Sequence, residues 1–211
     1  MPKIELLHID CMEYMKGLPD KAFELAIVDP PYGIDMSKGA GETRGVLGKK
    51  KKDLYVSKDW DNERPNQEYF NQLIRVSKNQ IIWGGNYFAD LLKPSRCWIY
   101  WRKLMGGNYS DGELAWTSFD AILKEFTKRS DQGGRIHPTQ KPVALYRWLL
   151  HNYAKPGDKI LDTHGGSRSL AIACHQMGFD HVSCEIDLDY HNDSVKRFKE
   201  QTMQQDLFRG L

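Results

Sequence analysis

Short apolar runs alternate along the chain with segments in which apolar residues recur every three or four positions. The first pattern is typical of buried strands and the second of amphipathic helices. The apolar runs predict strands at 4–9, 23–28, 80–83, 97–101, 121–126, 159–162 and 181–186. Helical spacing is found at 11–18, 66–77, 143–153, 167–177 and from 189 onward. This alternation predicts an α/β fold, doubly wound around a mostly parallel sheet of seven strands.

Length and composition are those of a single globular domain. The chain has 211 residues, of which 40% are hydrophobic and 27% charged. No stretch approaches the roughly 18 uncharged apolar residues that a membrane helix needs. The first ten residues lack the apolar centre of a secretion signal. We therefore expect one domain, residues 1–211, in a cytoplasmic protein without a membrane partner.

The cysteines and histidines do not have the spacing of metal ligands. Cys11, Cys97, Cys174 and Cys184 form no CxxC pair. The seven histidines form no HxxxH or HExxH motif. We expect reduced thiols and no bound metal.

A basic run stands out in a chain whose net charge is only +2. Lys49, Lys50, Lys51 and Lys52 lie in the segment 33–65, which is polar, rich in glycine and lysine, and longer than an ordinary connection. Segments of that kind are usually functional or disordered. The run is either a solvated loop or an arm that contacts phosphates, and the second reading depends on a nucleic-acid site nearby.

The sequence Asp29-Pro30-Pro31-Tyr32 directly follows a predicted strand. Ligands of open α/β sheets bind beyond the carboxyl ends of the strands. Two prolines remove two N–H donors and leave rigid carbonyl acceptors. Asp29 and the Pro30 carbonyl would thus form a stiff acceptor site, beside an aromatic ring, that suits a primary amine. The alternative is a turn that merely ends the strand.

A glycine turn joins the strand 159–162 to the next helix, in the order Asp162, Thr163, His164, Gly165, Gly166. Such a turn lets a ligand approach the backbone and the helix N-terminus. Glu185 ends the following strand, 19 residues after Gly166. An acidic residue about 20 positions beyond the glycines commonly accepts from ribose hydroxyls. We favour this role for Glu185 over that of a surface acid.

Two further segments carry little information alone. His137-Pro138-Thr139-Gln140-Lys141-Pro142 precedes a helix, where Thr139 could cap it and Lys141 could meet a carboxylate. On its own this segment is best read as a capped helix start. Asp10 is another acid at the end of a strand.

Together, and in this order, these motifs resemble the circularly permuted beta class of DNA amino-methyltransferases, which methylate adenine N6 or cytosine N4. The resemblance covers nearly the whole chain. The segments 83–88, 98–103 and 110–116 are similar to small phage-type members. It implies a Rossmann-like methyltransferase fold with a permuted motif order and S-adenosylmethionine as cofactor.

The resemblance also implies roles for individual residues. Asp10, with Cys11 beside it, would accept from the adenine amine of the cofactor, Glu185 would bind the ribose and Asp162 the amino group. The methionine end of the cofactor would be surrounded by Thr139, Lys141, Gly166 and Ser167, and His164 and Gly165 would also contact the cofactor. The catalytic set would be Asp29, Pro30, Pro31 and Tyr32, with Tyr32 stacked on a flipped target base.

The chain departs from the family pattern in two places. The usual cofactor loop is Asp-Pro-Phe-x-Gly-Ser-Gly, whereas here His164 replaces the phenylalanine and Arg168 the last glycine. We expect the His164 ring to cover the cofactor and Arg168 to point outward. The target-recognition segment of the family is reduced to residues 127–136, which suggests a homodimer or modest sequence specificity.

The sequence therefore predicts methyl transfer from S-adenosylmethionine to adenine N6 in double-stranded DNA, with Lys49–Lys52 on phosphates. Aspartate at position 29, where the family also has serine, favours adenine over cytosine N4. Other readings are an RNA adenine methyltransferase and an inactive nucleic-acid-binding module. A nicotinamide oxidoreductase lacks its glycine fingerprint. A restriction or phage partner is a further expectation.

Overall fold

The computed structural model describes residues 1–34, 63–104, 110–129, 136–137 and 139–209, with side chains to residue 203. Their strands form a sheet of eight, in the order β1-β8-β7-β2-β3-β5-β4-β6. The strands are β1 (Ile4–His8), β2 (Phe23–Val28), β3 (Ser77–Trp83), β4 (Trp98–Arg102), β5 (Gly112–Thr117), β6 (Lys124–Thr127), β7 (Lys159–Asp162) and β8 (Asp180–Glu185).

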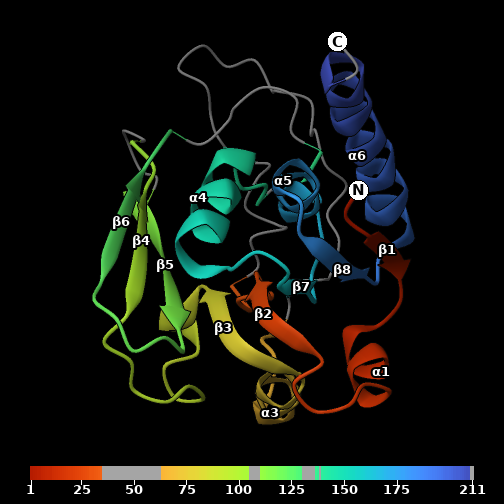
Figure 1. Ribbon diagram of the computed structural model, residues 1–211. Coiled ribbons are helices and arrows are strands. Elements are labelled where there is room, and N and C mark those ends of the chain that lie inside the picture. The colour runs from red at the N-terminus through yellow and green to blue at the C-terminus, as the bar shows by residue number, and fades with distance from the viewer. Residues whose placement is uncertain (35–62, 105–109, 130–135, 138, 210–211) are drawn as a thin grey trace, which may run out of the picture.

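Helices cover both faces of this sheet (Figure 1). They are α1 (Cys11–Lys16), α3 (Gln67–Val76), the 3-10 turn η2 (Gly85–Tyr87), α4 (Val143–Tyr153), α5 (Ser169–Met177) and α6 (Leu188–Arg209). One core forms where α4 and α5 pack on the sheet. The second lies on the other face, under α1 and α3. The doubly wound α/β architecture expected from the sequence is thus confirmed.

Burial on both faces of the sheet explains the apolar run in the central strand β2. Leu25 and Ile27 belong to the core under α4 and α5, while Ala26 and Val28 belong to the core on the opposite face. A segment buried on both faces has no solvent-facing positions, which explains the continuous apolar run from Leu25 to Val28.

The directions of the strands determine at which edge of the sheet each strand ends. β5 runs antiparallel to both β3 and β4, so β4 points the same way as β3. β6 is parallel to β4, and the pairs joining β1, β8, β7, β2 and β3 are parallel too. All strands except β5 therefore end at one edge of the sheet, which we call the carboxyl edge. β5 begins at that edge.

The expectation of seven strands was wrong, because β5 was not predicted. Its sequence, Gly-Glu-Leu-Ala-Trp-Thr, places the acidic Glu113 in the strand. The charge is tolerated because Lys103 and Lys141 pair with it. The sequence does not reveal either pairing, because both lysines are distant from Glu113 along the chain. The predicted strand 121–126 also begins later, at Lys124.

The described residues lack two further features. None of their helices is long and apolar enough to cross a membrane. They also contain no cluster of three His, Cys, Asp or Glu side chains able to hold a metal ion.

Candidate active site

A cavity of about 290 Å³ opens at the carboxyl edge, beyond the ends of β2, β7 and β8. Most predicted site residues line it: Asp10, Asp29, Pro31, Thr139, Lys141, Asp162, His164, Gly165, Gly166, Ser167 and Glu185. These residues come from opposite ends of the chain. They meet because parallel strands bring their carboxyl ends to the same edge.

The other predicted residues lie elsewhere. Tyr32 and the buried Pro30 adjoin lining residues. Cys11 is the first residue of α1 and does not line the cavity; burial raises the pKa of its thiol to about 12. Lys49–Lys52 fall outside the described residues.

Both carboxylate oxygens of Asp29 have partners. The Tyr32 hydroxyl donates to Oδ1 at 2.6 Å. The Lys141 ammonium donates to Oδ2. Burial raises the pKa of Asp29, and the positive charge of Lys141 opposes that rise. The two partners hold the carboxylate in a defined orientation just beyond the end of β2.

Lys141 is a buried cation between two acids. Its side chain is 2% exposed, and its Nζ lies 3.1 Å from Oε2 of Glu113 as well as against Asp29. Lys103 pairs with the other oxygen of Glu113. Burial acts to lower the pKa of Lys141, but the two carboxylates outweigh it and the pKa is raised. The charges alternate from Lys103 through Glu113 and Lys141 to Asp29, and we call these four residues the charge chain.

The sequence revealed only part of this network. It predicted that Lys141 could meet a carboxylate, and its ammonium does pair with Asp29 and Glu113. The family resemblance placed Lys141 beside the cofactor, and Lys141 does line the cavity. Glu113 and Lys103 were not candidates at all. The one signal was the acidic Glu113 inside the segment 110–116, to which the resemblance gave no residue roles.

Asp162 ends β7 and is 5% exposed. Its Oδ1 accepts from the backbone N–H of His164 at 3.0 Å. Burial raises the pKa of Asp162 to about 7. The ring of His164 is neutral at pH 7 because burial lowers its pKa to about 4. The cavity thus has a carboxyl group that an approaching cation would ionise, beside a flat uncharged ring.

Backbone N–H groups orient the two outer acids. Glu185 accepts from Gly166 N at 2.8 Å through Oε2 and from Asp187 N at 3.0 Å through Oε1. Asp10 caps α1, with Oδ1 accepting from Met12 N at 2.8 Å and from Glu13 N at 3.0 Å. A carboxylate oxygen has two lone pairs, so both side chains keep acceptor capacity toward the cavity.

Arg168 does not point outward as we expected. Its side chain is fully buried, and its guanidinium donates to Ser183 Oγ and, at 3.2 Å, to Leu7 O. A Cβ atom on Gly165 would collide with Nη1 of Arg168. The side chain therefore passes beneath the glycine turn, where its charge opposes the rise that burial causes in the pKa of Asp162. Arg168 is not among the residues that line the cavity.

The backbone at Arg168 explains why a glycine suits that position. Its φ of 58° is left-handed, a conformation that costs a residue with a side chain on the order of 1 kcal/mol. The buried guanidinium bonds offset that cost here. Arginine in place of the glycine of the family pattern therefore changes the contacts beneath the glycine turn and does not fill the cavity above it.

Tyr32 is held by its aromatic neighbours. Its ring stacks on Tyr87, with centroids 4.9 Å apart and an interplanar angle of 15°. Gly84 has a φ of 68°, and a Cβ there would collide with the Tyr32 ring. Tyr87 and Gly84 thus both lie against the Tyr32 ring, and Tyr87 is 39% exposed.

Several lining residues carried no sequence signal as site residues, because they are ordinary helix and loop residues: Tyr146, Ser169, Leu170, Ile186, Asp187 and Tyr190. His137 and Gln140 belong to the segment before α4 and line the cavity as well. Burial lowers the pKa of His137 to about 4, which leaves it uncharged at neutral pH.

Comparison with known families identifies the architecture. The sequence profile of an N6/N4 DNA methylase family matches residues 82–196, more than half of the chain. The chain belongs to this family of DNA methylases. The match runs from the end of β3 into α6 and includes Lys141, Asp162 and Glu185, but begins after Asp29.

Two relatives of this DNA methylase span nearly all of it. YubD of Escherichia coli K12, named as a putative methylase, is 24% identical over 93% of this chain and 91% of its own. The type II methyltransferase M.HinfI of Haemophilus influenzae is 21% identical, over 92% and 68%.

Solved structures share the fold. The complex of M1.HpyAVI with SAM matches with a TM-score of 0.61 and 18% identity, over 92% of this chain and 99% of its own. The cytosine-N4-specific PvuII DNA methyltransferase gives 0.60 and 14%, over 93% and 88%. The expected Rossmann-like methyltransferase fold is confirmed.

Proposed function

We propose that this DNA methylase transfers the methyl group of S-adenosylmethionine to the exocyclic N6 amine of adenine in double-stranded DNA, as a beta-class enzyme. The observation that carries the proposal is the order of four acids along the carboxyl edge. Asp10, Glu185, Asp162 and Asp29 follow the ends of β1, β8, β7 and β2, which are consecutive in the sheet.

This order matches the parts of the cofactor and substrate. Asp10 and Glu185, on neighbouring strands, suit the adenine amine and the ribose hydroxyls. Asp162 suits the amino group of the methionine end. Asp29 comes next, where the amine that receives the methyl group would lie. The fit extends to the neutral ring of His164, which lines the same cavity.

Asp29 and the Pro30 carbonyl then act on the target amine. An adenine amine is a weak nucleophile because its lone pair is delocalised into the ring. Hydrogen bonds from its two protons to these acceptors favour a pyramidal nitrogen, and the carboxylate stabilises the positive charge that grows on it. The cofactor supplies a methyl group already activated on a sulfonium. Positioning is therefore the main task of the protein.

The charge chain supports this role. Asp29 must be ionised to stabilise the positive charge that grows on the target amine. Lys141 favours the ionised state of Asp29 in this buried site. Glu113 compensates Lys141, so the cation can remain paired while Asp29 accepts a substrate proton donor. The base must leave the duplex stack, at a cost of about a few kcal/mol, which stacking on Tyr32 partly offsets.

The test is transfer of a labelled methyl group from S-adenosylmethionine to unmethylated duplex DNA, with analysis of the product nucleosides. Label in N6-methyladenine is the expected result. Label in N4-methylcytosine would keep the mechanism and overturn the base, an alternative that the fold shared with the PvuII enzyme keeps in view. Label in matched RNA alone would overturn the substrate. Cofactor binding without transfer to either would favour an inactive module.

Cofactor affinity should depend on the protonation of Asp162. Its pKa in the free protein is raised to about 7 by burial, and a bound ammonium would lower it. Affinity should therefore fall up to tenfold per pH unit below about pH 7, measured by titration calorimetry at pH values where the amino group of the ligand is still protonated. The control is 5′-methylthioadenosine, which lacks the amino acid part and should show no such fall. Equal pH profiles for both ligands would refute the assignment.

The basic run Lys49–Lys52 should add affinity for DNA without sequence information. Replacement of all four lysines by alanine should reduce the slope of log affinity against log salt by about 0.9 for each phosphate that is no longer neutralised. Filter-binding at several salt concentrations measures this slope. The matched control is Lys155→Ala, an exposed lysine that precedes β7 at the opposite edge of the sheet. An unchanged slope in the quadruple variant would contradict the prediction.

A further inference from the structure

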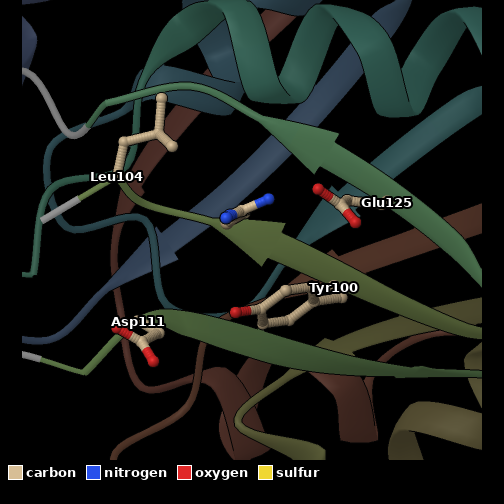
Figure 2. A pocket seen from close by; sticks show the side chains of 5 residues that line it. Tyr100, Leu104, Asp111 and Glu125 are labelled. Carbon is tan, nitrogen blue, oxygen red and sulfur yellow. The ribbon is translucent and has the colours of Figure 1, made fainter.

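A second cavity, of about 320 Å³, lies away from the first one. Figure 2 shows the side chains around it, which come from Tyr100, Arg102, Leu104, Asp111 and Glu125. Tyr100 and Arg102 belong to β4 and Glu125 to β6. Leu104 follows β4, and Asp111 precedes β5. We call it the β4–β6 pocket.

This pocket faces the same edge of the sheet as Asp29. β4 and β6 end at the carboxyl edge, and β5 begins there. Arg102, at the end of β4, and Asp111, just before β5, therefore lie at the same edge of the sheet as the first cavity.

The pocket and the charge chain share the same strands. Lys103 follows Arg102 and pairs with Glu113, the second residue of β5. Glu113 in turn pairs with Lys141, which holds Asp29. Successive side chains on a strand point to opposite faces. The pocket and the charge chain therefore lie on opposite faces of the sheet, and they share its carboxyl edge.

Tyr100 and Gly112 shape the pocket. A Cβ atom at Gly112 would collide with the Tyr100 ring, so the ring can lie across the backbone of β5 only because that position is glycine. Gly112 is opposite Arg102 in the pairing of β4 and β5. The aromatic ring and the guanidinium thus line one small space.

The polar groups of the pocket are available to a ligand. Arg102 is exposed, and its guanidinium has no hydrogen bond or ion pair with any residue of the described ranges. Asp111 and Glu125 are exposed carboxylates, and Glu125 accepts from Thr127 Oγ1 at 2.7 Å. A phosphate would suit the arginine but would be repelled by two acids. The occupant must instead present both acceptors and donors.

The major-groove edge of a G·C pair has this combination. Guanine presents O6 and N7 as acceptors, to which arginine binds in a bidentate manner, and cytosine presents its N4 amine as a donor to Glu or Asp. We propose that the β4–β6 pocket reads a G·C pair next to the target base, with Arg102 on guanine and Glu125 on cytosine. This inference rests on the proposed DNA substrate.

Selection of randomised duplexes by binding tests it without need of turnover. The wild-type protein should enrich a site with one fixed G·C pair. Arg102→Ala should lose about ten- to a hundredfold of the preference at that pair and keep the preferences elsewhere, and Glu125→Gln should relax the same pair. Methyl transfer to the enriched site is measured in parallel. The matched control is Arg96→Ala, which removes an exposed arginine before the start of β4.

The outcomes separate the two proposals. If Arg102→Ala loses its preference at one base pair, the proposed role of the pocket is supported. If the wild-type protein also transfers no methyl group, the proposed function fails and the role of the pocket stands. Transfer by a protein whose Arg102→Ala variant keeps the full base profile overturns the pocket alone. A uniform loss of affinity across all sequences would make Arg102 a phosphate contact and also overturn the pocket, as would a wild-type site without a G·C pair.

Discussion

Asp29→Asn should reduce methyl transfer at least about a thousandfold while cofactor affinity stays nearly unchanged. The amide keeps the size of the side chain but loses the charge that stabilises the developing ammonium of the substrate. Removal of one preorganised electrostatic group of this kind costs about 10²–10³ in turnover, and Asn offers only one acceptor oxygen to Tyr32, Lys141 and the amine. Single-turnover methylation and calorimetric titration of S-adenosylmethionine measure the two effects.

Tyr32→Phe is the matched control for this loss. It removes the hydroxyl that donates to Asp29 at 2.6 Å but keeps the ring that stacks on Tyr87. Its turnover should fall far less than that of Asp29→Asn. Asp29→Asn with normal turnover would show that the amine is activated elsewhere. An equal loss of cofactor affinity and turnover would show that Asp29 serves the cofactor instead.

Lys141→Met should lower both stability and activity. The substitution leaves Asp29 and Glu113 buried near each other without the cation between them. Breaking a buried pair by removing one partner costs about 3–5 kcal/mol of unfolding free energy. The pKa of Asp29 should rise further, since Lys141 now holds it down. The acidic limb of the pH–rate profile should then move to higher pH.

A second variant separates fold from function. Lys141→Met combined with Glu113→Gln removes one of the two uncompensated acids and should recover part of the stability. The shift of the pH profile should persist, because Asp29 still lacks its cation. Lys103→Met provides the control, since Lys103 pairs with Glu113 at the far end of the charge chain from Asp29. A pH profile unchanged from wild type in Lys141→Met would refute the role of Lys141.

The acids of the first cavity could be predicted from the sequence because each lies at the end of a strand or just after it. Asp10, Asp29, Asp162 and Glu185 required only that the strands be parallel, which the alternation of strands and helices indicates. No contact between distant residues had to be known. The comparisons confirm the family and the fold, while the individual roles of these residues stay predictions.

The charge chain could not be predicted in the same way. It depends on β5, an antiparallel strand between β3 and β4, and on pairing between residues distant in the chain. The prediction for Arg168 was wrong for a related reason. Whether a side chain after a glycine turn points outward or inward depends on the space under the turn, here provided by Gly165 and by the Ser183 hydroxyl.

The strand order β1-β8-β7-β2 has a consequence for folding on the ribosome. β1 emerges first, but among the strands of the described residues it pairs only with β8, which emerges almost last. Until then the nascent chain carries an unpaired strand edge, the kind of surface that invites association with other chains. The counter-ion of Asp29, Lys141, is also synthesised later, because it lies 112 residues further along the chain. Release of the C-terminal segment therefore completes the sheet by adding β8, and with it Glu185 of the first cavity. A translation product truncated before β8 would lack this part of the cavity and would be prone to aggregate.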